Sequence, residues 1–225
     1  MTENRLNFYG RRKGRPLRKA MAELLETDLP RWRLPRNLAD LPGLFSHAPA
    51  DIWLEIGFGG GEHLAARAAA APQEGFIGAE PFINGVASLL RHRAAAGCRN
   101  ILIWDDDVRL ILPGWPAASL AGAYILFPDP WPKKRHAARR ILNPPMLDEL
   151  ARLIRPGGLL RLASDHTVAK SWLLEEATRH PAFAWTARRP QDWRRPPPDW
   201  PGTRYMKKAE KEGRQPSWFD FRRCS

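Results

Sequence analysis

Residues 52–61 read IWLEIGFGGG, a short apolar run that ends in a turn rich in glycine. The apolar run predicts a buried strand, and the glycines let the backbone turn sharply and let a ligand approach closely. The alanine-rich stretch at 62–71 then predicts a helix. A strand, a glycine turn and a helix in this order open a βαβ unit, which indicates a parallel sheet.

The alternation of strands and helices continues along the chain. Apolar runs predict further strands at 76–80, 100–104, 123–127, 159–163 and 217–221. Apolar periodicity and capping residues predict helices near 17–27 and at 82–96, 144–153 and 167–178. Strands separated in this way by helices imply an α/β fold whose mostly parallel sheet is covered on both faces.

The two ends of the chain depart from this pattern. The first 16 residues are basic, and we expect them to form a mobile arm. Beyond about residue 181 the chain reads RRPQDWRRPPPDWPG at 188–202, which is too rich in proline for regular structure. We therefore expect residues 1–50 to be a basic arm and helix, and residues 51–225 to be the main domain with a basic C-terminal segment.

The net charge of +12 is concentrated in three runs. Residues 1–20 carry +6, residues 133–140 carry +5 and residues 186–225 carry +6, so the rest of the chain carries −5. Clustered cations of this kind bind phosphates, because their contacts release counterions from a nucleic acid. A solvated surface is the alternative for any single run. A membrane surface is disfavoured, because no run lies on a strongly amphipathic apolar face.

Targeting and metal signals are weak. The chain opens on polar and basic residues and contains only short apolar stretches, so we expect a cytoplasmic protein with no membrane span. Cys98 and Cys224 are too few and too far apart for a disulfide framework or a zinc site. The six histidines show no ligand spacing, so no metal is expected.

The glycine loop carries the first chemical signal. Gly57, Gly59 and Gly61 follow the first strand, at the edge of the sheet where parallel α/β folds bind cofactors. A dinucleotide fingerprint needs a small residue at position 62, but Glu62 stands there and would repel a pyrophosphate. Glu55, just before the glycines, suits a cationic ligand instead. S-adenosylmethionine, with its ammonium and its sulfonium, is such a ligand.

Acidic residues also end the next two strands. Glu80 lies 23 positions after Gly57, the spacing of an acid that accepts both hydroxyls of a ribose. The third strand leads into Asp105, Asp106 and Asp107, one of which could accept a hydrogen bond from an adenine amino group. A helix cap is the alternative for any one of these acids.

The fourth strand ends in FPDPWPKKRH at 127–136, which places Asp129 between two prolines. An aspartate before a proline is also a common turn former. The adjoining cations favour a functional role, because a structural turn alone does not explain them. We expect phosphates to be held by the cations that follow Asp129, namely Lys133, Lys134, Arg135, Arg139 and Arg140.

A set of motifs then resembles one family. The motifs are EIGFGGG, GAE, FPDPWPKKRH, LASD at 162–165 and GTRY at 202–205. Together they closely resemble the bacterial tRNA (guanine-N7-)-methyltransferases over roughly residues 50–221. FPDPWPKKRH is specific to that family, whereas the glycine loop is shared by class I methyltransferases in general. The resemblance implies a Rossmann-like sheet of seven strands, S-adenosylmethionine as donor, and methylation of a guanine in the variable loop of tRNA.

The resemblance also assigns roles to residues. It implies that Glu55, Glu80 and Asp107 contact the donor and that Asp129 is the active-site acid. Contacts to the substrate are implied for Lys133, Asp165, Thr203, Arg204, Tyr205 and the following position. That following position is Met206 here, where the family usually has glutamate, and a methionine side chain cannot supply a carboxylate contact.

The chemistry of the base constrains the acid. Guanine N7 carries a lone pair and no proton, so methylation needs no general base. Asp129 or Asp165 could instead accept hydrogen bonds from guanine N1 and N2, which become more acidic as positive charge develops. Capping the helix at 167–178 is the alternative for Asp165. We expect Trp131 to support its loop, with stacking on a base as the alternative, and His136 to be a polar contact.

Two rival classes share parts of this pattern. A nicotinamide-dependent oxidoreductase would share the sheet and Glu80, but Glu62 and the FPDPWPKKRH loop argue against it. A non-catalytic RNA-binding protein would keep the cations but would not need Asp129. The expected partner is tRNA. No obligate protein partner is expected, and the chain is expected to be a monomer or a homodimer.

Overall fold

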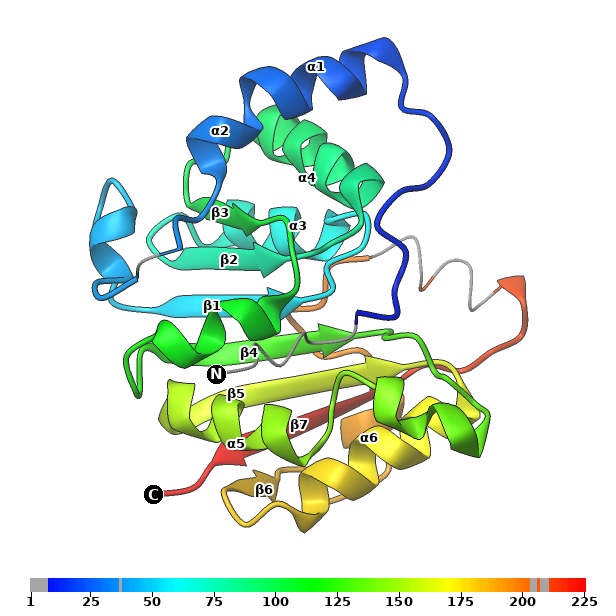
Figure 1. Cartoon of the computed structure of the whole chain (residues 1–225). Coiled ribbons are helices and arrows are strands. Elements are labelled where there is room, and N and C mark those ends of the chain that lie inside the picture. Colours follow the sequence, from blue (N-terminus) through cyan, green and yellow to red (C-terminus); the bar gives the residue numbers. More distant parts are fainter. Residues whose placement is uncertain (1–7, 37, 203–205, 207–210) are drawn as a thin grey trace, which may run out of the picture.

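The computed structural model describes residues 8–36, 38–202, 206 and 211–225. Its centre is a seven-stranded sheet in the order β3-β2-β1-β4-β5-β7-β6 (Figure 1). Only β7 runs against its neighbours β5 and β6. The strands are β1 (Ile52–Ile56), β2 (Gly75–Ala79), β3 (Ile101–Trp104), β4 (Leu120–Leu126), β5 (Ile154–Ser164), β6 (Phe183–Trp185) and β7 (Ser217–Arg223). The expected α/β fold with a mostly parallel sheet of seven strands is confirmed.

Helices cover both faces of the sheet. Within the described ranges, the α-helices with given bounds are α1 (Lys19–Thr27), α2 (Leu29–Trp32), α3 (Glu62–Ala70), α4 (Ile83–Ala96), α5 (Pro144–Leu153), α6 (Thr167–Arg179) and α7 (Gln191–Arg194). Short 3-10 helices are η1 (Pro42–Leu44), η2 (Val108–Leu110), η3 (Leu112–Gly114) and η4 (Lys134–Arg139). One apolar cluster joins α3 and α4 to the sheet, and a second joins α5 and α6 to it.

Strand β1 lies at the point where the strand order reverses. Leu54 pairs with Ile77 of β2 on one side and with Ala123 of β4 on the other, and all three side chains are fully buried. Because β1 to β4 are parallel, their carboxyl ends meet at one edge of the sheet. Open α/β sheets bind their ligands at this edge and at this reversal.

Two strands begin earlier than their apolar runs predict. Strand β4 begins at Leu120, and β5 begins at Ile154, directly after α5 ends at Leu153. The turn signal Pro156–Gly158 therefore lies inside β5 rather than before it. The pairing of β4 with β5 shifts register between Leu120 and Gly122, so an irregularity in the ladder accommodates these residues.

The segment after residue 181 is more regular than its prolines indicate. Strand β6 pairs with β7, with Phe183 opposite Arg223, and α7 follows. Phe183 is the only buried residue of the three in β6. A strand of three residues with one buried side chain gives too little periodicity to be recognised from sequence.

The arm at the N-terminus is packed against the body where it is described. The backbone N–H of Gly14 donates to Asn84 Oδ1 at 2.8 Å, and Asn84 Nδ2 donates to the carbonyl of Arg15 at 2.8 Å. Arg12 Nη1 lies 2.7 Å from Asp106 Oδ1. The expectation of a mobile arm is wrong for residues 8–16, because these polar contacts bind it to α4 and to the end of β3. Residues 1–7 lie outside the described part.

Over the described ranges, no helix is both long enough and apolar enough to cross a bilayer. The division at residue 50 between arm and main domain stays a prediction.

Candidate active site

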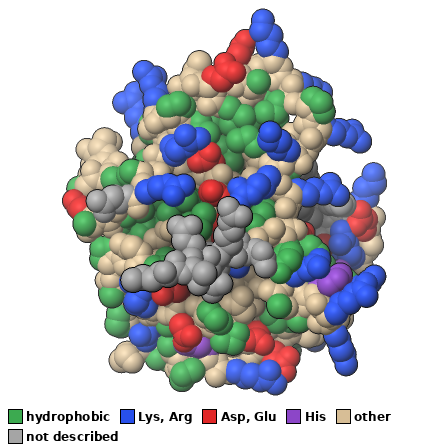
Figure 2. Space-filling view, in the orientation of Figure 1, with side chains coloured by type: hydrophobic (Ala, Val, Ile, Leu, Met, Phe, Trp, Pro, Cys, Tyr) green, Lys and Arg blue, Asp and Glu red, His purple; other side chains and the backbone are tan. Residues whose placement is uncertain are grey.

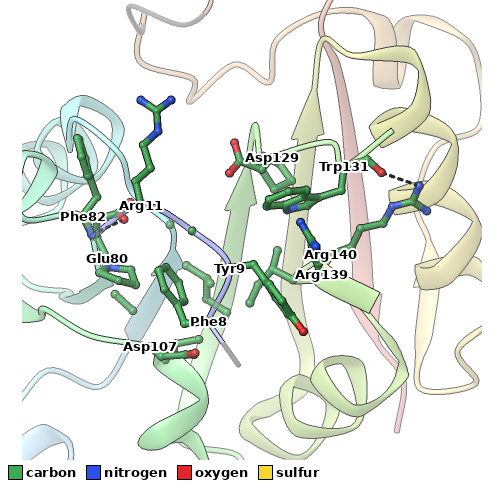
Figure 3. A pocket seen from close by; sticks show the side chains of 18 of the residues that line it. Phe8, Tyr9, Arg11, Glu80, Phe82, Asp107, Asp129, Trp131, Arg139 and Arg140 are labelled. Atoms are coloured by element: carbon green, nitrogen blue, oxygen red, sulfur yellow. Dashed lines mark hydrogen bonds between the residues drawn. The ribbon is translucent and has the colours of Figure 1, made fainter. Parts of the chain in front are cut away.

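A cavity of about 740 Å³ opens at the carboxyl edge of the sheet. Its walls come from the residues that follow β1, β2, β3 and β4, and from the loop that leads into η4. Figure 3 shows Glu80 and Asp107 on one side of this cavity and Asp129, Trp131 and Arg139 on the other. The carboxyl ends of β1 to β4, each predicted from sequence to carry an acid, are therefore neighbours. Three of these acids, Glu80, Asp107 and Asp129, line the cavity.

The glycine loop forms the floor of the cavity. Gly57 and Gly59 line it with backbone φ of +73° and +55°. A Cβ added to Gly57 would stand in open space, so a side chain there would take room from a ligand. Helix α4 approaches the loop so closely that a Cβ on Gly85 would lie 2.2 Å from the carbonyl oxygen of Gly59. Close backbone packing therefore fixes the shape of the floor.

Gly61 has a different role from the other two glycines. It is the N-cap of α3 with φ of +79°, and it packs against Leu89 rather than lining the cavity. The next residue, Glu62, has its carboxylate over the loop, because a Cβ on Gly60 would lie 2.4 Å from its Oε2. A negative charge thus occupies the start of the helix, where a dinucleotide-binding site receives a pyrophosphate.

Glu80 is held by backbone groups at the end of β2. Its two carboxylate oxygens accept hydrogen bonds from the N–H groups of Gly59 at 2.8 Å and Phe82 at 3.0 Å. Burial raises the pKa of Glu80, the two backbone N–H groups lower it, and the negative charges of Asp129 and Glu55 raise it further. The net direction is upward. A carboxylate fixed at both oxygens is a rigid acceptor for a ligand in the cavity.

Asp107 lines the cavity but is already engaged. It caps η2 by accepting from the backbone N–H of Arg109 at 3.0 Å, and it pairs with the guanidinium of the same residue at 2.5 Å. The capping alternative is therefore observed, while its carbonyl also accepts from Trp104 Nε1 at 2.8 Å. Asp105 pairs with Arg33, and Asp106 pairs with Arg12. Each acid of the run therefore has its own arginine partner.

Glu55 is buried next to the cavity rather than in its wall. Its side chain is 2% exposed, and its Oε2 lies 2.7 Å from Nδ1 of His63, a residue of α3. Both residues line a second cavity of about 40 Å³ that shares Gly57 and Phe127 with the main one. Glu55 is therefore adjacent to the main cavity through the glycine loop.

Asp129 lies exposed on the rim of the main cavity. The residues before and after its two prolines, Phe127 and Trp131, have positive φ of 51° and 39°. Bulky residues seldom adopt this conformation, and it persists only where surrounding contacts impose it. The backbone N–H of Phe127 donates to the carbonyl of Ala163 at 2.8 Å, and Arg140 Nη2 donates to the carbonyl of Trp131 at 3.2 Å. The turn that carries Asp129 is thus held at both ends.

The cations after Asp129 divide into two groups. Lys133, Lys134 and Arg135 are exposed at the start of η4. Several Lys and Arg side chains lie at the right edge of the face in Figure 2, where Figure 1 shows this loop. Arg139 and Arg140 are half-buried and line the cavity. The first group is available to a large polyanion, and the second shapes the cavity.

Arg139 lies between two aromatic rings. Its guanidinium carbon is 4.8 Å from the ring centre of Tyr9 and 5.0 Å from that of Trp131, and Figure 3 shows Tyr9 reaching into the cavity beside them. This contact joins the N-terminal arm to the loop after β4. Residues 8–11 also line the cavity. No sequence motif indicates this, and only the structure reveals it.

His136 lies against Trp131, with ring centres 5.8 Å apart. Partial burial and the positive charges of Arg139, Arg135 and Lys133 lower its pKa. A histidine in this setting is a neutral polar group at physiological pH. That agrees with its expected role as a polar contact.

Of the substrate residues expected in the C-terminal half, the structure describes only Asp165 and Met206. Asp165 pairs with Arg214, with 3.1 Å between Oδ2 and Nη1, while the cap of α6 is His166. The capping alternative for Asp165 is therefore wrong. Met206 is half-buried. Thr203, Arg204 and Tyr205 lie outside the described residues.

Solved structures share this fold. The 16S rRNA methyltransferase KamB superposes with a TM-score of 0.58 at 15% identity, covering 85% of this chain and 96% of that one. The 16S rRNA (adenine(1408)-N(1))-methyltransferase of Catenulisporales acidiphilia gives a TM-score of 0.52 at 14% identity, covering 84% and 97%. Identities this low establish the fold alone, which is that of the class I methyltransferases.

Sequence comparison identifies the family within this class. A family model described as "Putative methyltransferase" matches residues 49–217. The tRNA (guanine-N(7)-)-methyltransferase of Rhodospirillum rubrum is 50% identical over 222 residues, covering 96% of this chain and 87% of that protein. The enzyme of that name from Rhizobium meliloti is 48% identical over 220 residues, covering 96% and 95%. The chain belongs to the tRNA (guanine-N(7)-)-methyltransferase family, as its motifs predicted.

Proposed function

We propose that this protein transfers a methyl group from S-adenosylmethionine to N7 of a guanine in tRNA and forms 7-methylguanosine. One observation carries the proposal. The glycine loop, Glu80, Asp107 and Asp129 line a single cavity of about 740 Å³ with a basic loop at its rim. The tRNA (guanine-N(7)-)-methyltransferase of Rhodospirillum rubrum, 50% identical over 96% of this chain, supports the same reaction.

The main cavity fits the donor. It has the volume of a site for a ligand of this size, and Gly57 leaves open space at its floor. Glu80 is the group we assign to the ribose hydroxyls, because its carboxylate is fixed at the wall. Asp107, which lines the cavity after β3, is assigned to the adenine end. Gly57 and Gly59 allow close approach, and Gly61 supports the loop from beneath.

Charge favours a cationic donor over a dinucleotide. Glu55, Glu62 and Glu80 surround the glycine loop, and the carboxylate of Glu62 lies near the start of α3. This environment repels a pyrophosphate and attracts the ammonium and sulfonium groups of S-adenosylmethionine. We assign Glu55 to the ammonium. The nicotinamide alternative therefore has no support at this loop.

The acceptor chemistry assigns Asp129 an electrostatic role. When bound, the donor supplies an electrophilic methyl group on a sulfonium. Guanine N7 carries no proton, so the residues of this chain have none to remove. Asp129 lies on the cavity rim and is assigned to accept hydrogen bonds from N1 and N2 of the guanine. Positive charge develops on the purine during the reaction, so this contact is stronger in the transition state than in the ground state.

Docking of a folded tRNA is assigned to the basic surface. Lys133, Lys134 and Arg135 are exposed beside Asp129 and suit phosphate contacts. Arg139 and Arg140 line the cavity, where a guanidinium can contact either a phosphate or a base. Asp165, Thr203, Arg204, Tyr205 and Met206 remain assigned to the substrate by their place in the family motifs.

The position of the target base, the cellular location and the oligomeric state are proposed as well. The target is a guanine of the variable loop, the protein acts in the cytoplasm, and it works as a monomer or a homodimer. Light scattering of the purified protein, alone and with tRNA, measures the last of these.

Methyl transfer to tRNA tests the function directly. Protein is incubated with radiolabelled S-adenosylmethionine and unmodified bulk tRNA, and the product is digested and analysed as nucleosides. We expect label in 7-methylguanosine. Label in another nucleoside, or tRNA binding without any transfer, would overturn the assignment, and the second result would favour the non-catalytic RNA-binding class.

A further inference from the structure

Helix α3 carries His63, a buried histidine that the reaction described above does not use. His63 is 4% exposed, and its Nδ1 lies 2.7 Å from Oε2 of the equally buried Glu55. The carboxylate oxygen accepts, so Nδ1 must carry the hydrogen in this contact. The other ring nitrogen, Nε2, is buried without a hydrogen-bond partner. One face of His63 thus serves Glu55, and the other is unsatisfied.

Aromatic rings fix the imidazole in place. The ring centre of His63 lies 5.0 Å from that of Tyr124 at an interplanar angle of 76°, and 4.9 Å from that of Trp200 at 37°. Trp200 also lies 5.5 Å from Trp218 of β7. A ring held on two sides keeps its orientation, so Nδ1 stays directed at Glu55.

Trp200 is itself fastened by the residue before it. Asp199 Oδ2 lies 2.8 Å from Arg67 of α3, and its Oδ1 lies 2.9 Å from Arg161 of β5. The proline-rich segment is therefore tied to the helix that carries His63 and to the sheet beneath it.

A small cavity connects this cluster to the donor site. Glu55, His63 and Trp200 line the second cavity of about 40 Å³, which shares Gly57 and Phe127 with the main one. Its volume has room for a single small polar group, such as an ammonium. Two acids line it, Glu55 and Glu62, which suits a cation, and Glu55 is the one that His63 contacts.

We propose that His63 is a positioning residue, which orients the Glu55 carboxylate toward the ammonium of the methyl donor while Trp200 fixes its ring. This inference rests on the proposed function, which assigns Glu55 to that ammonium. A buried carboxylate without a hydrogen-bonding neighbour is costly and free to turn, and His63 prevents both. The main cavity then holds the adenosine part of the donor, and the small one receives the ammonium of its amino-acid end.

Two ligands separate positioning from general support. S-adenosylmethionine has the amino-acid end, whereas 5′-methylthioadenosine lacks it and retains the adenosine part. Calorimetric titration of the full chain with each ligand gives two affinities per variant. A change confined to S-adenosylmethionine identifies a role at the amino-acid end, and an equal change in both identifies a role in folding alone.

Paired substitutions test which ring nitrogen matters. In His63→Asn the amide can reach the place of Nδ1, and in His63→Gln it reaches the place of Nε2. We expect His63→Gln to weaken S-adenosylmethionine binding by about tenfold and 5′-methylthioadenosine binding by less than about twofold. We expect His63→Asn to stay within about threefold of wild type for both ligands. The exposed His47 provides a control, because His47→Gln should change neither affinity.

The outcomes are distinct. Equal S-adenosylmethionine affinity in His63→Gln and His63→Asn, or an equal loss for both ligands, would overturn the inference. Failure of the proposed function appears elsewhere, as absent methyl transfer by the wild-type protein or as unchanged S-adenosylmethionine affinity in Glu55→Gln. Because the titrations contain no tRNA, they report on His63 whether or not tRNA is the acceptor.

Discussion

The carboxylate of Glu80 accepts a hydrogen bond at 2.8 Å from the backbone N–H of Gly59, so the end of β2 and the glycine loop after β1 are fixed to each other. Two elements that are 21 residues apart in the chain thereby form one rigid wall of the main cavity. An acceptor that is fixed before the ligand arrives loses little conformational entropy on binding.

Replacement of this carboxylate should weaken donor binding. Glu80→Ala removes the carboxylate that we assign to the ribose hydroxyls, together with its hydrogen bond from the Gly59 N–H. Charge-assisted hydrogen bonds contribute about 1.5–3 kcal/mol, so we expect the S-adenosylmethionine dissociation constant to rise by about 10- to 100-fold. Calorimetry measures this, with the exposed Glu26→Ala as control. Wild-type affinity in Glu80→Ala would reject the ribose assignment.

The raised pKa of Glu80 gives a test in the free protein. Burial raises this pKa above 4.5, so between pH 4.5 and the folded-state pKa the folded protein binds more protons at this site than the unfolded chain does. Stability contributed by Glu80 must therefore fall as pH rises through that window. The difference in unfolding free energy between wild type and Glu80→Gln, from urea titrations between pH 4.5 and neutrality, should become less favourable to wild type. A difference independent of pH would contradict a raised pKa.

Asp129 should affect turnover rather than donor binding. Asp129→Asn removes the charge that we assign to stabilising the cationic purine but keeps a residue of similar size on the turn. Loss of one such contact costs about 2–4 kcal/mol, so we expect kcat to fall by about 10²–10³. The affinity for S-adenosylmethionine should remain near wild type, because Asp129 lies on the rim. Undiminished turnover with bulk tRNA would remove Asp129 from the catalytic role.

The exposed cations of the loop after β4 should set the salt dependence of tRNA binding. Each phosphate contact contributes about 0.7–0.9 to the slope of log affinity against log salt. Neutralising Lys133, Lys134 and Arg135 to glutamine should therefore reduce the slope by about 2 and weaken binding at low salt. Filter binding at several salt concentrations measures it. A matched triple change of the exposed Arg91, Arg99 and Arg179 to glutamine should change the slope less, and an equal effect would deny the loop a special role.

Much of this site follows from sequence because its chemistry lies at the ends of parallel strands. Glu80, Asp107 and Asp129 each follow an apolar run, so strand order alone brings them together at one edge. The distant partners of the acids at this edge do not follow from local pattern. Asp106 pairs with Arg12, which lies 94 positions away, and such a contact depends on how the arm crosses the sheet.

The N-terminal arm shows the same limit. Its charge predicted a mobile segment, but the charge of a run does not reveal the uncharged contacts that hold it. Asn84 binds both Gly14 and Arg15 with one amide, and Tyr9 reaches the cavity. Strand β6 was missed because three residues show too little periodicity, and the ion pairs of Asp199 were missed because a proline-rich segment is placed by its tertiary partners.

The ion pairs of Asp199 should stabilise the fold and the position of Trp200. Asp199→Asn removes the contacts to Arg67 and Arg161, although Arg161 keeps its pair with Asp220. Asp199 is 39% exposed, so solvent screening limits the expected loss to about 1–2 kcal/mol of unfolding free energy. Burial raises the pKa of Asp199, but the two arginines outweigh it and the net shift is downward, so this stability is present above pH 3.8 and is lost as pH falls further. Urea unfolding at neutral pH measures the loss, and Asp148→Asn, whose side chain is 74% exposed, should lose clearly less. Equal losses in the two variants would show that Asp199 is only a surface charge.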